Sequence, residues 1–131
     1  MKVILTPTEA EEIFYTALCN AVGTGYMDGY GIRMSCDRGQ YKSSREHLEN
    51  LGKDTCYEDV LMQILRDGGS LTFVDLEGEG EMTRSIYMTD VHARVQEVDA
   101  QCIINFHNEV DDAADADVVL QTVFFGELIF G

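Results

Sequence analysis

Hydrophobic positions recur every three to four residues behind Pro7, and this spacing predicts an amphipathic helix. Thr6 fits the N-cap, Pro7 the first helical position and Glu9 the third position of a capping box. Gly23 supplies the residue at which such a helix ends. The short run over residues 2–5 in front of the cap is β-prone.

Two more helices are expected in the middle of the chain. The first has a narrow apolar stripe, formed by Tyr41, Ser44, Leu48 and Leu51. The second follows Thr55 as its N-cap, has Glu58 at the capping-box position and ends at Gly68. The buried face of this second helix is expected to consist of Val60, Leu61, Ile64 and Leu65.

Between residues 71 and 88 the hydrophobic period changes from helical to alternating. Residues 71–76 and 82–88 are predicted strands, joined by the turn Glu77-Gly78-Glu79-Gly80-Glu81 into a β-hairpin. Residues 32–36 form a third, short strand. We therefore expect an α+β fold, in which a small antiparallel sheet that includes the hairpin packs with five or six helices. Ile64 and Phe73 should both be buried in it.

The last third of the chain is predicted to hold three helices. The first is capped by Thr89 or Asp90 and runs through Val98, the second covers about 100–109, and the third begins near Asp112. Residues 118–125 are apolar on every side, and their β-branched content leaves a strand as an alternative. As a helix, this segment is either central to the core or covered by a second copy in a homodimer.

Charge narrows the range of functions. The chain has 131 residues, the size of one domain, and its 24 acids and 9 bases give a net charge of −15. No Lys or Arg occurs from Val95 to the end. Phosphate backbones are bound by neutralising them with Lys and Arg, so no direct nucleic-acid binding is expected. The acids either keep the protein soluble or form a face for a basic protein partner.

The residues most suited to such a partner lie in two acidic runs and one loop. The loop is the glycine-rich segment 23–31, whose tyrosines can make contacts. The candidate partner-binding residues are Glu77, Glu79, Glu81, Asp111, Asp112, Asp115, Asp117, Tyr26 and Tyr30. The run 111–117 fails as a calcium loop, because Ala113 and Ala116 occupy the positions that need an acid and a glycine.

Enzymatic and metal chemistry is the alternative. His107, Glu109 and Asp111 are close in sequence and suggest a metal site, although their spacing matches no known motif. His92 with Asp90 is a second candidate pair, and Cys102 with His92 or His107 is a candidate nucleophile and base. The chain has no phosphate-binding or hydrolase motif, so no cofactor is expected and the sequence favours a non-enzymatic role.

The cysteines and the termini indicate a compartment. The four cysteines, at 19, 36, 56 and 102, include no closely spaced pair, which favours reduced thiols in a cytoplasmic setting. The first residues contain an apolar run too short for a signal peptide, and no segment reaches the length of a membrane span.

Several stretches resemble small acidic proteins of unknown function from gut bacteria and their phages or mobile elements. They are residues 2–6, residues 57–65, the Gly-Glu-Gly-Glu turn with Asp90-Val91-His92, and Phe124-Phe125-Gly126-Glu127. The resemblance implies a bacterial, intracellular setting and assigns no activity. The sequence therefore predicts an acidic interaction protein, such as a mobile-element accessory factor, that contacts a basic protein.

Overall fold

The computed structural model describes residues 4–22, 31–77 and 80–129. Within them the chain forms six α-helices and one three-stranded antiparallel sheet, so the α+β prediction is confirmed. The helices are α1 (Pro7–Val22), α2 (Arg38–Asn50), α3 (Tyr57–Arg66), α4 (Met88–Arg94), α5 (Ala100–His107) and α6 (Ala113–Phe125), with a 3₁₀ turn, η2 (Val95–Glu97), after α4. The strands are β1 (Ile32–Ser35), β2 (Leu71–Asp75) and β3 (Arg84–Ile86).

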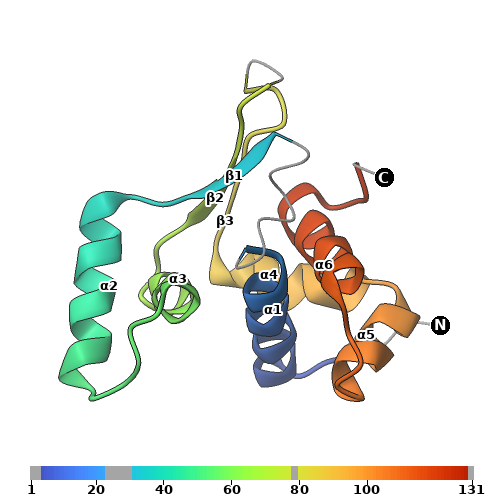
Figure 1. The fold of residues 1–131 in the computed structure, drawn as a ribbon, viewed down its shortest axis with the longest axis horizontal. Coiled ribbons are helices and arrows are strands. Elements are labelled where there is room, and N and C mark those ends of the chain that lie inside the picture. Colours follow the sequence, from blue (N-terminus) through green and yellow to red (C-terminus); the bar gives the residue numbers. More distant parts are fainter. Residues whose placement is uncertain (1–3, 23–30, 78–79, 130–131) are drawn as a thin grey trace.

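The sheet has the strand order β1-β2-β3, and its fully buried side chains lie on one face. Leu71 pairs with Ile86 across β2 and β3, and Met34 pairs with Phe73 across β1 and β2. On the opposite face the hydroxyls of Thr72 and Ser85 lie 2.7 Å apart. The hairpin of β2 and β3 projects from the helices at the top of Figure 1.

The core is built around α6, which packs along α1 and also contacts α4, α5 and β3. Phe124 of α6 stacks on Phe73 with ring centroids 3.7 Å apart, and the ring centroid of Phe14 of α1 lies 6.3 Å from that of Phe124. Leu120 is fully buried as well. Residues 118–125 are thus part of a central helix, and the strand alternative is wrong. Ile64 and Phe73 are buried as predicted.

Helix α2 lies at the edge of this core, to which it contributes Leu48. It stands at the left of Figure 1 and packs mainly on α3, which separates it from α1. Only Ser44 and Leu48 of α2 are buried. Leu51, predicted to complete the apolar stripe, is the C-cap and is 54% exposed, because the helix ends before its side chain can turn inwards.

Several predicted boundaries are shifted. α3 has Cys56 as its N-cap instead of Thr55, so Asp59 and not Glu58 lies three residues beyond the cap. α4 has Tyr87 as its N-cap, whose N–H donates to the Asp90 carboxylate at 2.8 Å. Asp90 is therefore the third helical residue and not the cap. The second hairpin strand is also shorter than predicted, because Met88 already belongs to α4.

Candidate functional site: an acid-rimmed groove between α1 and α5

A groove of about 870 Å³ runs between α1 and α5, beside the segment that precedes α1. In Figure 1 this segment passes from the start of α1 towards α5. Its apolar lining comes from three parts of the chain and consists of Ile4, Leu5, Ile13, Ile103, Ile104 and Phe106. Tyr15 and Thr16 of α1 also line it. The charged or titratable lining residues along the rim are Glu9, Glu12, Glu109, Asp111 and His107. The site therefore combines apolar surface with negative charge.

The helical period of α1 explains how one helix serves both the core and the groove. Ala10, Phe14 and Ala17 are fully buried against the rest of the protein. Glu9 and Ile13 lie about a third of a turn away on the helix, and both line the groove. The start of the helix is fixed by reciprocal hydrogen bonds, in which the Thr6 N–H donates to Glu9 and the Glu9 N–H donates to the Thr6 hydroxyl. This confirms the predicted capping box.

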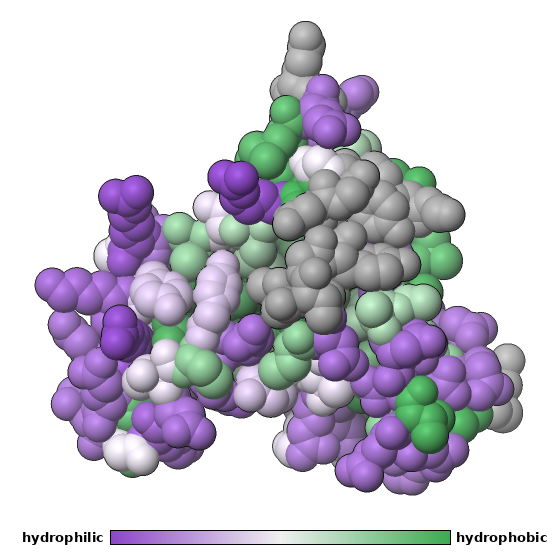
Figure 2. Space-filling model, in the orientation of Figure 1, coloured by the Kyte–Doolittle hydropathy of each residue, from purple (hydrophilic) through white to green (hydrophobic). Residues whose placement is uncertain are grey.

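On the other wall, α5 turns a large apolar side chain to solvent. Ile103 and Phe106 are nearly buried, whereas Ile104 is 42% exposed and Val110, after the helix, is 65% exposed. Figure 2 shows hydrophobic surface at the lower right, over α5 and the start of α6, surrounded by hydrophilic surface. An exposed apolar patch with a polar rim is typical of an interaction site.

The rim carboxylates are differently engaged. Hydrogen bonds from the backbone and side chain of Thr6, with a smaller effect of His107, lower the pKa of Glu9. Asp111 accepts a hydrogen bond from the Asn20 side-chain amide, which ties the loop before α6 to α1. Glu12 and Glu109 are exposed. The lowered pKa favours the charged form of Glu9.

Glu109 adopts a conformation that usually belongs to glycine. Its φ is 59°, and among described residues it is the one non-glycine with positive φ. Its N–H donates to the Phe106 carbonyl and the Val110 N–H donates to the Asn105 carbonyl, which closes α5 in a Schellman motif. A left-handed conformation disfavours residues with a Cβ atom. The carboxylate is thus held at the rim at some cost in backbone energy.

The metal site considered as an alternative, with His107, Glu109 and Asp111 as ligands, is not assembled by the described residues. No group of three or more His, Cys, Asp or Glu side chains that could hold a metal ion occurs in the described part of the chain, which includes His107, Glu109 and Asp111. His92 does not pair with Asp90 either, because its Nε2 lies 3.0 Å from Glu11 of α1. Glu11 also lies 3.5 Å from Arg66 and so joins α1, α3 and α4.

Cys102 also departs from its predicted role. It is 4% exposed, and its thiol donates to Asp115 instead of meeting a histidine. Burial and the neighbouring Asp115 carboxylate raise the pKa of this thiol to about 12, so the thiol stays protonated at neutral pH. Cys102 therefore lacks the thiolate that covalent catalysis needs. All four cysteines are free thiols.

The predicted acidic residues do not form one face. Glu77 and Glu81 are exposed near the hairpin tip, and Asp112 and Asp115 form the capping box of α6, at the opposite end in Figure 1. Asp117 was predicted to be available to a partner, but its side chain points inwards from α6, is 7% exposed and accepts hydrogen bonds from Gln121. Tyr26, Tyr30 and Glu79 lie outside the described residues. Of the predicted partner residues that the structure describes, Asp111 alone borders the groove.

Positive charge is also unevenly placed, which the prediction missed although the sequence contains the signal. Residues 33–53 hold three acids and five of the nine bases, namely Arg33, Arg38, Lys42, Arg45 and Lys53. That segment has a net charge of +2, so the rest of the chain carries −17. All five bases are exposed, and three of them lie on α2, far from the groove in Figure 1.

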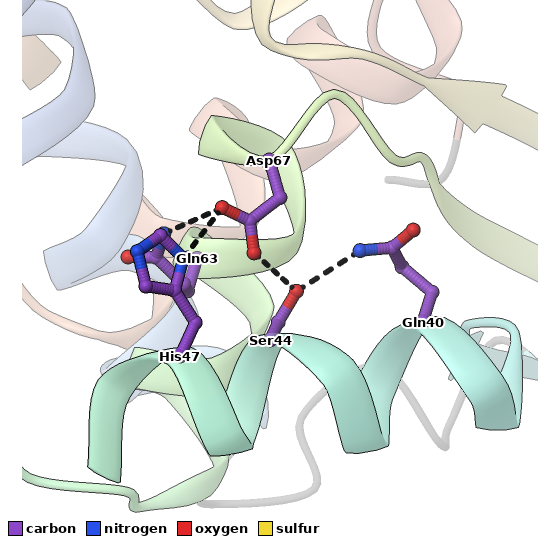
Figure 3. Close-up of polar contacts among 5 residues, drawn as sticks. All are labelled: Gln40, Ser44, His47, Gln63 and Asp67. Atoms are coloured by element: carbon purple, nitrogen blue, oxygen red, sulfur yellow. Dashed lines mark hydrogen bonds and ion pairs between the residues drawn. The ribbon is translucent and has the colours of Figure 1, made fainter. Parts of the chain in front are cut away.

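A serine, a histidine and an aspartate also meet between α2 and α3 (Figure 3). The Ser44 hydroxyl donates to one oxygen of Asp67 at 2.8 Å, while His47 Nδ1 lies 2.9 Å from the other oxygen and Gln63 donates to it. In a catalytic triad the histidine stands between serine and aspartate. Here Ser44 bonds the aspartate directly and is fully buried. The cluster therefore joins two helices and has no nucleophile.

Comparison with known proteins adds no further constraint, since the chain matches no protein-family model, no curated protein and no solved structure. Within the described residues, no helix has the length and apolar character needed to cross a membrane.

Proposed function

We propose that this protein is a non-enzymatic interaction protein that binds a basic surface of another protein. The groove between α1 and α5 supports the proposal, because it exposes apolar side chains inside a rim of carboxylates. Apolar contacts supply affinity, and the negative rim selects a partner of opposite charge and speeds its approach. A role without chemistry of its own would suit the accessory factor of a mobile element.

The proposal is tested by capturing partners from cells that express the tagged chain. The wild type is compared with the double variant Glu12→Gln/Glu109→Gln, which removes two exposed rim charges, and with Glu46→Gln, which removes one exposed acid from α2. We expect a basic protein to be enriched by the wild type and by Glu46→Gln, and to be reduced in the rim variant.

The partner is then purified and titrated with the wild-type protein at rising salt. Since the rim and the partner attract each other by charge, the affinity should fall as salt screens them. Enrichment of acidic or uncharged proteins alone, or an affinity that is independent of salt, would contradict the proposal.

A further inference from the structure

We infer that the groove between α1 and α5 binds an amphipathic helix of a partner protein, with apolar side chains on one face and lysine or arginine beside them. This deepens the proposed function and rests on it. The argument uses the floor of the groove, its rim and the elements that form its walls.

The floor offers anchor positions for apolar side chains. Ile104 is 42% exposed and Ile4 is 84% exposed, while Ile103, which also lines the groove, is almost buried. Contacts with an incoming apolar side chain would remove these two isoleucines from water, which is favourable in proportion to the area covered. A volume of about 870 Å³ admits several side chains and is too open to fill with a single one.

The rim decides the charge of the occupant. Glu9, Glu12, Glu109 and Asp111 border the floor, and no Lys or Arg among the described residues lines the groove. An acidic segment would be repelled, and a neutral one would leave the negative charge of the rim uncompensated. Lysine or arginine residues that flank the apolar face of the occupant would meet these carboxylates, with their long side chains reaching from the floor to the rim.

The walls favour a helix over an extended segment. An extended peptide binds by adding a strand to a sheet edge, whereas a helix lays its apolar face into a groove. Both walls of this groove are helices, and the sheet edges of β1 and β3 lie elsewhere in Figure 1. The spacing of the anchors in the occupant should therefore be helical, at three and four residues.

A second copy of the chain does not supply this occupant from its described residues. Helix α2 is the basic helix, with Arg38, Lys42 and Arg45 exposed. Its buried side chains, Ser44 and Leu48, already pack on α3. Hence α2 presents charge without an apolar face, and the occupant comes from another protein.

The test uses a synthetic peptide of about 14 residues, roughly four helical turns, with leucines at three- and four-residue spacing and lysines elsewhere. Two control peptides keep the length. One has the same composition with the leucines scattered around the helix, and the other replaces lysine by glutamate. Binding is measured by calorimetry at low and at high salt, and the fold of each protein variant is checked by circular dichroism.

We expect the lysine–leucine peptide to bind, with about tenfold weaker affinity for Ile104→Ser, because a buried isoleucine contact is lost. Glu12→Gln/Glu109→Gln should weaken binding about threefold to tenfold at low salt and reduce the salt dependence. The controls Leu51→Ser and Glu46→Gln alter exposed residues of the same types in the α2 region and should leave the affinity unchanged.

The inference would be overturned if the peptide with scattered leucines bound as tightly as the lysine–leucine peptide, or if the lysine–leucine peptide bound Ile104→Ser as tightly as the wild type. It would also be overturned if the free chain formed a dimer that Ile104→Ser abolishes. The proposed function fails separately, when cells yield no basic partner. If a basic partner is captured and binds the groove variants as well as the wild type, the proposed function stands and the groove is not its site.

Discussion

Single residues in this protein are held by polar contacts, of which only some could be predicted from the sequence. The capping box of Thr6 and Glu9 follows from residue type and spacing, and the structure contains it. Asp67 was not a candidate, yet it accepts hydrogen bonds from Ser44 and Gln63 and lies beside His47. These partners come from two helices, so no local pattern could join them. Glu109 likewise gave no signal of its left-handed backbone.

Replacing Glu109 by glycine should stabilise the fold and weaken the binding of the lysine–leucine peptide. Glycine adopts a positive φ without steric cost, so the free energy of unfolding should rise by about 1 kcal/mol. The rim loses a carboxylate at the same time. Urea denaturation and calorimetry measure the two effects.

Glu109→Asn is the matched control, since asparagine also tolerates this conformation and carries no charge. It should bind the peptide as weakly as Glu109→Gly. A loss of stability in Glu109→Gly would show that the Glu109 side chain stabilises α5.

Asp67 should make the fold sensitive to acid. Burial alone would raise the pKa of Asp67, but hydrogen bonds from Ser44 and Gln63 and the contact with His47 outweigh it and lower the pKa. Because the folded pKa is below the unfolded value of about 3.9, this stabilisation is present above that pH and is lost as the pH falls through the folded pKa.

Asp67→Asn should remove that pH dependence and, by breaking the network, cost about 1–3 kcal/mol at neutral pH. Urea denaturation of the wild type and the variant between neutral pH and about pH 3 gives both quantities. Asp54→Asn, at an exposed position before α3, is the control and should retain the wild-type profile.

At the level of elements, periodicity located the helices better than it located their ends. α6 begins at its predicted cap, Asp112, because the side chain of Asp112 accepts a hydrogen bond from the Asp115 N–H. α3 starts one residue late, and α4 follows Tyr87, which has no cap-forming signature. The groove itself was beyond prediction, since its walls are about ninety residues apart in the sequence and meet only in the folded chain, where both also pack on α6.

Shortening a buried side chain of α6 should destabilise the fold. Leu120 is fully buried, so Leu120→Ala removes apolar contacts and leaves a cavity, at a cost of about 2–5 kcal/mol in the free energy of unfolding. Leu128→Ala, at a position that is 59% exposed, should change the stability by less than about 0.5 kcal/mol. Thermal and urea denaturation compare them. Equal stability of the two variants would mean that α6 is not central.

Charge is unevenly distributed over the whole molecule, which the net charge of −15 alone does not show. The exposed bases of residues 33–53 form a weakly positive segment on β1 and α2, and the remaining chain is strongly negative. Figure 2 shows hydrophilic surface over α2 on the left. The total charge was enough to argue against phosphate binding, but its distribution requires the fold, which places α2 away from the acidic body.

No binding to duplex DNA is expected at physiological salt, because the negative remainder of the molecule repels phosphates that approach α2. A mobility-shift assay with short duplexes checks this. Micromolar binding that weakens with salt would contradict the prediction, and its loss in Arg38→Gln/Lys42→Gln would locate the contact on α2.

The polar contacts between α2 and α3, centred on Asp67, also determine which part of the fold opens first. Helix α2 contributes Leu48 and the partly buried Tyr41 to the apolar core and is otherwise held by hydrogen bonds such as that of Ser44 to Asp67, whereas α1, α3 and α6 form most of that core. Detaching α2 exposes little apolar surface, so it should open as a separate unit before global unfolding. Its amide protons should then exchange with deuterium at a rate set by this local opening. The amide protons of α6 should exchange more slowly, because their exchange requires global unfolding.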